Sequence, residues 1–249
     1  MKTINAVYSS ILALTMSTSA GYAKDDSNFL GSLVYVSSAS IYANIGSKSR
    51  TMPSLGYESE NIRVSVQEGL TYKLLDRSKS TMDISISPNF NPYDSSDSPD
   101  LSGMKRKMYF DGSVETSYKL NRGLTARFKF MMELSSEFNG NAADLSLSQY
   151  IPVSGVPVIV RAGSKWHDRN WAEYIYGVYS SEATGLRSQY APGNVFVPYL
   201  GLNTVYNLTD QMSLFASINA NFLPSKVKAS PIVSKQNSTS FIIGLGYKF

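Results

Sequence analysis

Hydrophobic and polar residues alternate one by one along most of the chain, and the pattern is clearest in residues 239–249. One parity of this stretch carries Phe241, Ile243, Leu245, Tyr247 and Phe249. The other parity carries Ser240, Ile242, Gly244, Gly246 and Lys248. A period of two predicts a β-strand, because successive side chains of a strand point to opposite faces. The apolar parity continues to the last residue, an aromatic, whereas chain ends are usually frayed and polar.

The same alternation predicts nine more strands. They fall at 29–36, 62–74, 82–86, 110–120, 124–134, 145–151, 158–166, 196–208 and 212–222. Glu68 interrupts the apolar face of the second strand, where we expect a β-bulge. Residues 38–59 and 167–195 are predicted as long connections. Splitting 53–66 or 167–195 into further strands would give twelve strands instead of ten, which is the alternative.

Short turns alternate with long polar connections along this series of strands. Asn121-Arg122-Gly123 and Thr209-Asp210-Gln211 are short turns, whereas 88–107 and 224–238 are long loops. Short turns at one end and long loops at the other are typical of transmembrane β-barrels of the bacterial outer membrane. The pattern therefore predicts an all-β, antiparallel transmembrane barrel with both chain ends on the short-turn, periplasmic side.

Charged residues fall on one parity of the predicted strands. They are Arg63, Lys73, Lys119, Arg127, Lys129, Arg161 and Lys165, with Asp83, Asp111, Glu115, Glu133 and Asp144. A soluble lipocalin-like barrel has an apolar interior, which cannot accommodate so many charges. The polar parity is therefore predicted to line the lumen and the apolar parity to face lipid. We expect Glu115 and Glu133 to pair with basic residues across the lumen and to help occlude it.

The N-terminus has the pattern of a secretory signal peptide. Lys2 precedes the mostly apolar stretch 6–16, and Ser19-Ala20-Gly21-Tyr22-Ala23 ends with the small residues of a cleavage site. Residues 1–23 are thus predicted as a signal peptide and 24–249 as the barrel domain, placed in the outer membrane of a Gram-negative bacterium.

Composition excludes several other classes of protein. The chain of 249 residues has a net charge of +4 without a basic block, so nucleic-acid binding is not expected. A single histidine and no cysteine argue against a transition-metal site. His167 and Asp168 are adjacent and would point apart on a strand, so we expect a surface-loop histidine and no hydrolase triad. No catalytic residue and no cofactor is predicted.

Several short blocks resemble the MipA/OmpV family of outer-membrane proteins. They are Leu101-Ser102-Gly103-Met104 with Arg106, Glu173-Tyr174-Ile175-Tyr176-Gly177-Val178, Ser188-Gln189-Tyr190-Ala191-Pro192-Gly193, Ser230-Pro231-Ile232-Val233 and Gly246-Tyr247-Lys248-Phe249. The family's name implies interaction with a lytic murein transglycosylase. The resemblance therefore implies a non-enzymatic scaffold between the outer membrane and murein-remodelling enzymes. The alternative is a small pore or a receptor that binds ligands with its surface loops.

The resemblance also suggests two sets of candidate residues. The first is a family-motif loop with Tyr174, Tyr176, Gly177, Val178 and Tyr190. The other interpretation is that these tyrosines anchor a folded-in loop or form part of an interface girdle. The second set is Tyr247 and Phe249, which resemble the signal that the barrel-assembly machinery recognises. Other expected partners are outer-membrane lipids and lipopolysaccharide.

Overall fold

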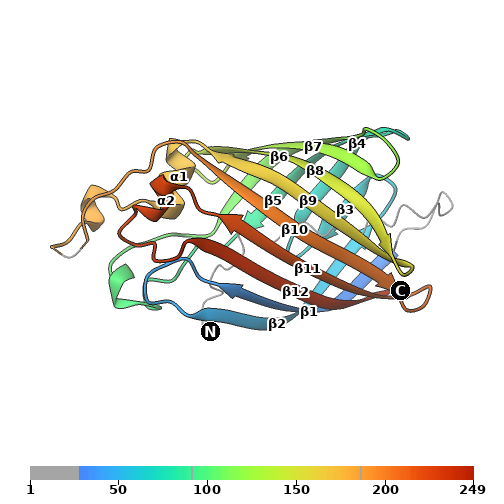
Figure 1. The fold of residues 1–249 in the computed structure, drawn as a ribbon, viewed down its shortest axis with the longest axis horizontal. Coiled ribbons are helices and arrows are strands. Elements are labelled where there is room, and N and C mark those ends of the chain that lie inside the picture. Colours follow the sequence, from blue (N-terminus) through green and yellow to red (C-terminus); the bar gives the residue numbers. More distant parts are fainter. Residues whose placement is uncertain (1–27, 91, 186) are drawn as a thin grey trace.

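The computed structural model describes residues 28–90, 92–185 and 187–249 as a closed antiparallel barrel (Figure 1). The predicted signal peptide, 1–23, lies outside the described residues. The strands are β1 (Asn28–Ala39), β2 (Ser47–Glu58), β3 (Ile62–Ser65), β4 (Gly69–Asp76), β5 (Ser80–Asn89), β6 (Tyr109–Lys119), β7 (Leu124–Glu133), β8 (Asn141–Val153), β9 (Val156–His167), β10 (Val195–Asn207), β11 (Met212–Phe222) and β12 (Asn237–Lys248). The helices are α1 (Arg169–Tyr176) and α2 (Ser225–Lys228), with short 3-10 turns η1 (Pro99–Leu101) and η2 (Ser180–Glu182). None of the described helices is long and apolar enough to cross a membrane.

Each strand pairs with its neighbours in sequence, and β12 closes the barrel against β1. The prediction of ten strands is wrong and the alternative of twelve is correct. The predicted connection 38–59 contains β2, and the predicted strand 62–74 is a hairpin of β3 and β4 around the turn 66–68. Glu68 therefore lies in a turn and not in a bulge. Gly69 leaves this turn with a φ of 79°, a conformation that favours glycine.

Connection lengths divide the barrel into two different ends. The connections 59–61, 77–79, 120–123, 154–155 and 208–211 are short turns at the end where the chain terminates. The connections 40–46, 90–108, 134–140, 168–194 and 223–236 are longer and lie at the other end, with α1 and α2 (Figure 1). Only 66–68 is short on that side. The predicted alternation of short turns and long loops is thus present, with both ends of the barrel domain on the short-turn side.

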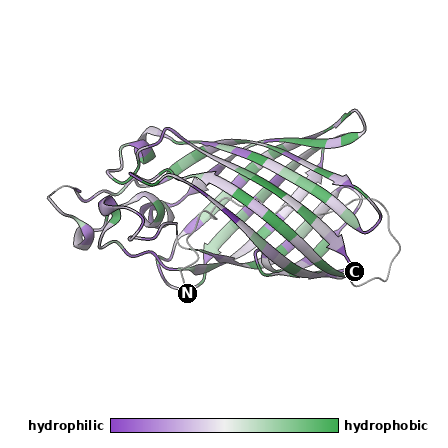
Figure 2. Ribbon diagram, turned by 90° about the horizontal axis from the view of Figure 1, so that it is seen from below, coloured by the Kyte–Doolittle hydropathy of each residue, from purple (hydrophilic) through white to green (hydrophobic). Residues whose placement is uncertain are grey.

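The apolar parity of the strands faces outward and the polar parity faces the lumen, as predicted. On β10, Phe196, Leu200 and Leu202 are 62%, 50% and 47% exposed, whereas the intervening Val197 and Tyr199 are each 3% exposed. Apolar residues alternate with polar ones along the strands throughout the wall (Figure 2). The outward positions form an apolar belt, and most inward positions are polar. The alternation is weak on β1 because its inward side chains are also apolar: Val34 and Val36 pack with Phe215 and Ile242.

The aromatic end of β12 lies on the outer surface. Tyr247 and Phe249 are 39% and 72% exposed, and their ring centroids are 4.9 Å apart. The amide of Phe249 donates a hydrogen bond to the carbonyl oxygen of Phe29 at 3.0 Å, so the last residue is tied to β1. Both rings are therefore held at the seam where the barrel closes and are accessible from outside.

Replacing Phe249 with aspartate is expected to lower the amount of assembled barrel several-fold, because it removes the exposed ring at this seam. Heat-modifiable migration of unboiled envelope samples measures the folded fraction. Asn237→Asp, at the exposed opposite end of β12, is the matched control and should assemble normally. Normal assembly of Phe249→Asp would contradict the assembly-signal interpretation.

Candidate functional site

The largest buried hydrophobic cluster lies at the long-loop end of the barrel. We call the described residues of 40–46, 90–108, 134–140, 168–194 and 223–236 the loop cap. Its buried side chains are Tyr42, Ile45, Tyr93, Leu101, Met104, Phe138, Trp171, Ala172, Tyr174, Ile175, Tyr176, Val178, Leu223, Val227, Ile232 and Val233. These side chains pack on the inward residues at the upper ends of the strands. The cap therefore covers the lumen at this end.

Helix α1 is the central element of the loop cap. Asp168 is its N-cap, and the carboxylate accepts hydrogen bonds from the backbone amides of Trp171 at 2.8 Å and Asn141 at 2.7 Å. Trp171, Tyr174 and Ile175 are buried, with the spacing of one helical face. The alternative of additional strands in 167–195 is therefore wrong. An N-cap aspartate followed by apolar residues at this spacing is a sequence signal that could have predicted the helix.

Aromatic rings of β6 and of the loop 134–140 pack against the rings of α1. The rings of Phe138 and Tyr174 stack with centroids 4.2 Å apart and an interplanar angle of 20°. Tyr109 of β6 meets Phe138 and Trp171 edge-on, with centroids at 4.9 and 5.7 Å. Such offset and edge-on pairs stabilise packing beyond the area they bury. They fix α1 against β6 and the loop 134–140.

Arg106 binds the C-terminal end of α1. Its side chain is 0% exposed and donates to the carbonyl oxygens of Tyr174 at 2.6 Å and Gly177 at 3.2 Å. The guanidinium also makes a bidentate pair with Glu182, at 2.5 and 3.1 Å. At Gly177 a Cβ atom would come within 2.5 Å of the carbonyl oxygen of Glu173. Glycine is therefore required where the chain leaves the helix.

Three tyrosine rings complete the environment of Arg106. The guanidinium carbon lies 5.7, 5.5 and 4.5 Å from the ring centroids of Tyr93, Tyr174 and Tyr179, within the range of cation–π attraction. Burial raises the pKa of Glu182, but hydrogen bonds from Arg106 outweigh this effect, and the net pKa is below its ordinary value. Both partners are therefore charged at neutral pH.

The remaining free carbonyls of α1 are satisfied by other loops. The hydroxyl of Tyr42 donates to the carbonyl oxygen of Ile175 at 3.1 Å, and the hydroxyl of Ser230 donates to that of Tyr176 at 2.6 Å. The last carbonyls of a helix have no partner within the helix. Here side chains from 40–46, 90–108 and 223–236 supply the missing donors, so α1 joins three loops into one unit.

Below the loop cap, inward-facing charges form a row across six strands. The register places these residues opposite one another in sequence: Lys73 of β4, Asp83 of β5, Glu115 of β6, Lys129 of β7, Asp144 of β8 and Lys165 of β9. We call these residues the charge row. Cross-strand neighbours of opposite sign are stabilising. The row has three basic and three acidic residues; four of its five adjacent pairs are of opposite sign, whereas Asp83 and Glu115 are like-charged neighbours.

Ion pairs and hydrogen bonds hold the charge row and the inward-facing residues near it. Arg127 lies 3.3 Å from Glu115 and 3.7 Å from Asp144. Arg63 pairs with Glu58 at 3.0 Å. The carboxylate of Glu58 also lies 4.0 Å from the ammonium of Lys73. Arg161 donates to Ser148 at 2.9 Å, and Asp111 accepts from Asn89 at 2.5 Å. Most of the residues that were predicted to line the lumen therefore occupy inward positions.

Two predicted lumen charges have other positions or partners. Lys119 ends β6 and is exposed beside the turn 120–123, so its predicted place in the lumen is wrong. Glu133 is buried but forms no ion pair with a basic side chain among the described residues. Its carboxylate accepts from the backbone amides of Ser135, Phe138 and Asn139, and so holds the loop 134–140. The predicted pairing of Glu133 with Arg127, Lys129 or Lys119 is therefore wrong.

A known protein family matches most of this chain. The family model of MltA-interacting protein MipA matches residues 30–249. The chain belongs to the MipA family. The protein is accordingly an outer-membrane β-barrel of a Gram-negative bacterium.

The chain is similar to several named MipA-family relatives. It is 24% identical to the outer-membrane protein YiaT of Escherichia coli (strain K12) over 213 residues, which cover 84% of this chain and 85% of the relative. It is 32% identical to the MltA-interacting protein of the same strain over 113 residues, 45% of each chain. Among solved structures, the NanC porin aligns with a TM-score of 0.51 and 9% identity over 88% of this chain and 100% of the porin. This last similarity concerns the fold alone.

In this MipA-family member the five predicted motif residues lie together in the loop cap. Tyr174 and Tyr176 are 3% and 6% exposed. Val178 and Tyr190 exchange two backbone hydrogen bonds, at 2.8 and 3.0 Å, and Gly177 accepts from Arg106. The geometry agrees with the alternative interpretation of the tyrosines as anchors of a folded-in loop. Arg106 was noted only as part of a motif, because its partners are distant in sequence.

His167 occupies a different position from the one predicted. It is the last residue of β9, is 8% exposed and faces the cavity beneath α1, so the prediction of a surface-loop histidine is wrong. Its neighbour Asp168 is committed to capping α1. The two side chains therefore serve different elements.

Proposed function

We propose that this MipA-family barrel is a non-enzymatic scaffold that holds murein-remodelling enzymes at the periplasmic side of the outer membrane. The observation that carries the proposal is a basic surface at the short-turn end. Arg77, Lys79, Lys119 and Arg122 are all exposed there. The amide of Lys119 donates to the carbonyl oxygen of Lys79 at 2.8 Å, so the turns that carry these residues are adjacent. We call these four residues the basic rim.

The basic rim suits a protein partner with an acidic surface, since complementary charges steer encounter and fix orientation. A relative that is 32% identical over 45% of the chain bears the name MltA-interacting protein. By the rule for outer-membrane barrels, the short-turn end faces the periplasm, where murein enzymes work. A lytic murein transglycosylase is therefore the proposed partner.

The covered lumen favours the scaffold over the alternative of a small pore. The loop cap packs over one end of the lumen, and the charge row with Arg127 crosses the space below it. An open channel for solutes would need a continuous polar path, which the buried rings of the cap interrupt. Binding at the rim needs no such path.

Charge reversal of the rim tests the proposal. The variant Arg77→Glu, Lys79→Glu, Lys119→Glu should capture about tenfold less lytic transglycosylase from crosslinked envelopes, because it replaces attraction with repulsion. Immunoblotting of the captured material measures the loss. Heat-modifiable migration establishes that the variant barrel is folded.

A control variant carries the same change at the opposite end: Lys226→Glu, Lys228→Glu, Lys235→Glu. These exposed residues lie in the loop 223–236. It should capture as much enzyme as the wild type. Absence of transglycosylase from the wild-type capture, or equal capture by the rim variant, would overturn the proposed scaffold.

A further inference from the structure

A cavity of about 530 Å³ lies in the lumen beneath the loop cap. Tyr109 and Trp171 line its upper part, and inward-facing residues of the strands, such as Asp144 and Lys165, line its walls. We call it the capped cavity. Its volume is that of a site for a small molecule. The residues that line it determine which chemical class of molecule fits.

Positive and negative charges balance on the lining of the capped cavity. Six basic and six acidic residues line it. Arg127 lies 3.3 Å from Glu115 and 3.7 Å from Asp144. Lys48 also pairs with Asp97. The cavity therefore offers no excess charge of either sign, and an ion that entered it would leave its own charge uncompensated in a buried site. A neutral molecule fits this lining best.

Three buried polar groups of the lining have no hydrogen-bond partner within the described residues. They are Oδ1 of Asp111, Nδ1 of His167 and Oγ of Ser240, and these residues are 5%, 8% and 9% exposed. The other carboxylate oxygen of Asp111 accepts a hydrogen bond from Asn89, so the carboxylate is already oriented. Buried polar groups without a partner are costly. A ligand that supplies the three missing partners would remove this cost.

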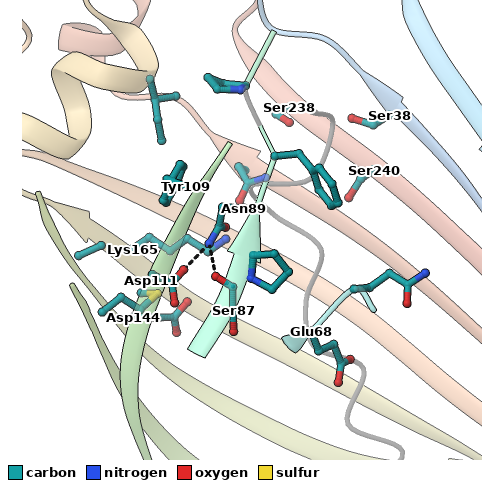
Figure 3. Close-up of a pocket in the computed structure, with 18 of the residues that line it drawn as sticks. Ser38, Glu68, Ser87, Asn89, Tyr109, Asp111, Asp144, Lys165, Ser238 and Ser240 are labelled. Carbon is teal, nitrogen blue, oxygen red and sulfur yellow. Dashed lines mark hydrogen bonds between the residues drawn. The ribbon is translucent and has the colours of Figure 1, made fainter. Parts of the chain in front are cut away.

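The three groups come from separate parts of the wall and need different partners. Asp111 lies on β6, His167 ends β9 and Ser240 lies on β12. Figure 3 shows Ser38, Ser238 and Ser240 on one side of the cavity and Asp111 on the other. An ionised carboxylate oxygen only accepts hydrogen bonds, whereas a serine hydroxyl both donates and accepts. A single ligand for all three must therefore carry donors and acceptors at several points, as the hydroxyl groups of a sugar do.

Aromatic rings lie next to these polar groups. The ring of His167 is nearly parallel to those of Trp171 and Tyr176, with centroids 6.0 and 6.1 Å apart and interplanar angles of 20° and 26°. The face of an aromatic ring carries partial negative charge. The C–H groups of a sugar ring carry partial positive charge and pack on such a face. The capped cavity thus matches both the hydroxyl groups and the apolar face of a sugar.

The lumen leads to the capped cavity from the short-turn end. A second cavity of about 180 Å³ lies at that end, beside Gln211 and Lys248. Met52, Arg63 and Glu68 line both cavities, so the two are neighbours along the lumen. In an outer-membrane barrel the short-turn end faces the periplasm. A periplasmic solute would therefore reach the capped cavity without crossing the loop cap.

We propose that the capped cavity is a binding site for a neutral sugar, a mono- or disaccharide that enters from the periplasmic end. Its hydroxyl groups donate to Oδ1 of Asp111 and bond to Ser240 and His167, and one face of its ring packs on Trp171. The sugar is bound and is not passed on, because the loop cap covers the other end of the lumen. This binding is independent of the scaffold role, which rests on the basic rim.

Titration calorimetry of the refolded protein tests the site. The protein is kept in a detergent without a sugar headgroup, because such a headgroup would compete. Glucose, galactose, maltose and lactose are the probes, and at least one should bind saturably with one molecule per barrel. The acidic and amino derivatives of that sugar, glucuronate and glucosamine in the case of glucose, should each bind about tenfold more weakly. Absence of saturable binding by all four probes, or equal binding of a charged derivative, would overturn the proposal.

Fluorescence of Trp171 locates the bound sugar. The chain has two tryptophans, and Trp166→Phe removes the one on the outward parity of β9, opposite Phe196. In this background the sugar that binds in calorimetry should shift the emission of Trp171 with the same saturation curve. Heat of binding without any change in this emission would place the sugar outside the capped cavity and would also overturn the proposal.

Two serine variants and an aspartate variant provide the matched comparison. Ser240→Ala removes a hydroxyl that has no partner in the free protein, so it should leave folding unchanged and weaken sugar binding about fivefold. Ser113→Ala is the control, because its hydroxyl is also buried and unpaired but lies outside the cavity lining. It should bind as the wild type does.

Asp111→Asn replaces the carboxylate and removes one negative charge from the lining. It should weaken binding of the neutral sugar about tenfold. It should also reduce the preference for the neutral sugar over its acidic derivative, which a purely structural role of Asp111 would not change. Equal affinities for the neutral sugar in Asp111→Asn, Ser240→Ala and Ser113→Ala would overturn the proposal.

Discussion

Replacing Arg106 with leucine is expected to destabilise the loop cap by about 3–5 kcal/mol, the usual cost of removing one partner of a buried ion pair. The substitution leaves the carbonyls of Tyr174 and Gly177 without their donor and Glu182 without its cation. It also removes the cation between three tyrosine rings. The barrel strands keep their own hydrogen bonds, so the loss should be confined to the cap.

Hydrogen exchange measures this local stability directly. The amides of Val178 and Tyr190, which bond to each other's carbonyls, should exchange much faster in Arg106→Leu than in the wild type. Lys107→Leu is the control one residue along. Lys107 is 71% exposed and pairs with Glu137 at 3.0 Å, so its loss should cost no more than about 1 kcal/mol. Equal protection in both variants would contradict the anchoring role of Arg106.

The same pair makes the cap sensitive to acid. The pKa of Glu182 is lower in the folded cap than in an unfolded chain, so its contribution to stability is complete at neutral pH. It is lost as the pH falls through the folded-state pKa. The protection factor of Val178, which corrects for the slower intrinsic exchange of amides in acid, should therefore fall more in the wild type than in Arg106→Leu.

The alternation of apolar and polar residues predicted most of the wall correctly because the belt has an apolar medium on one side only. Every second residue of β10 must face lipid, so the pattern survives without knowledge of the neighbours. β2 escaped prediction for a physical reason. Its upper half extends beyond the residues that pair with β3, carries Pro53 and has polar outward residues such as Ser49, so the period of two is weak there.

The site depended on contacts that are distant in sequence. Tyr174 and Tyr176 could be selected as candidates, but Arg106 reaches α1 from another loop. Parity assigned the charged side chains to the inward face, but the charge row could not be predicted, because the sequence does not give the register that places Glu115 opposite Lys129. Lys119 shows the limit of the parity argument, since parity gives the face of a strand and not the height along the barrel.

The second prediction with a large expected effect concerns which face of the barrel wall meets lipid. Ile84 lies in the middle of β5 on the outward parity and is 40% exposed. An arginine at this position would place a charge in the hydrocarbon region. Its expected cost is about 2–4 kcal/mol near the middle of the bilayer.

Ser85 is the matched position for the opposite face. It points inward, lines the cavity and accepts a hydrogen bond from Thr71 at 3.1 Å. An arginine there would extend into a polar space, with Asp83 on the same parity of β5. Ser85→Arg should therefore cost much less than Ile84→Arg, although the two positions are adjacent in the same strand.

The most direct test of the membrane-barrel account is the unfolding free energy of these two variants after refolding in lipid vesicles, measured by denaturant titration. The account predicts that Ile84→Arg loses about 2–4 kcal/mol and that Ser85→Arg stays close to the wild type. Equal losses, or a larger loss for Ser85→Arg, would mean that the outward apolar face does not meet lipid, and would contradict the account.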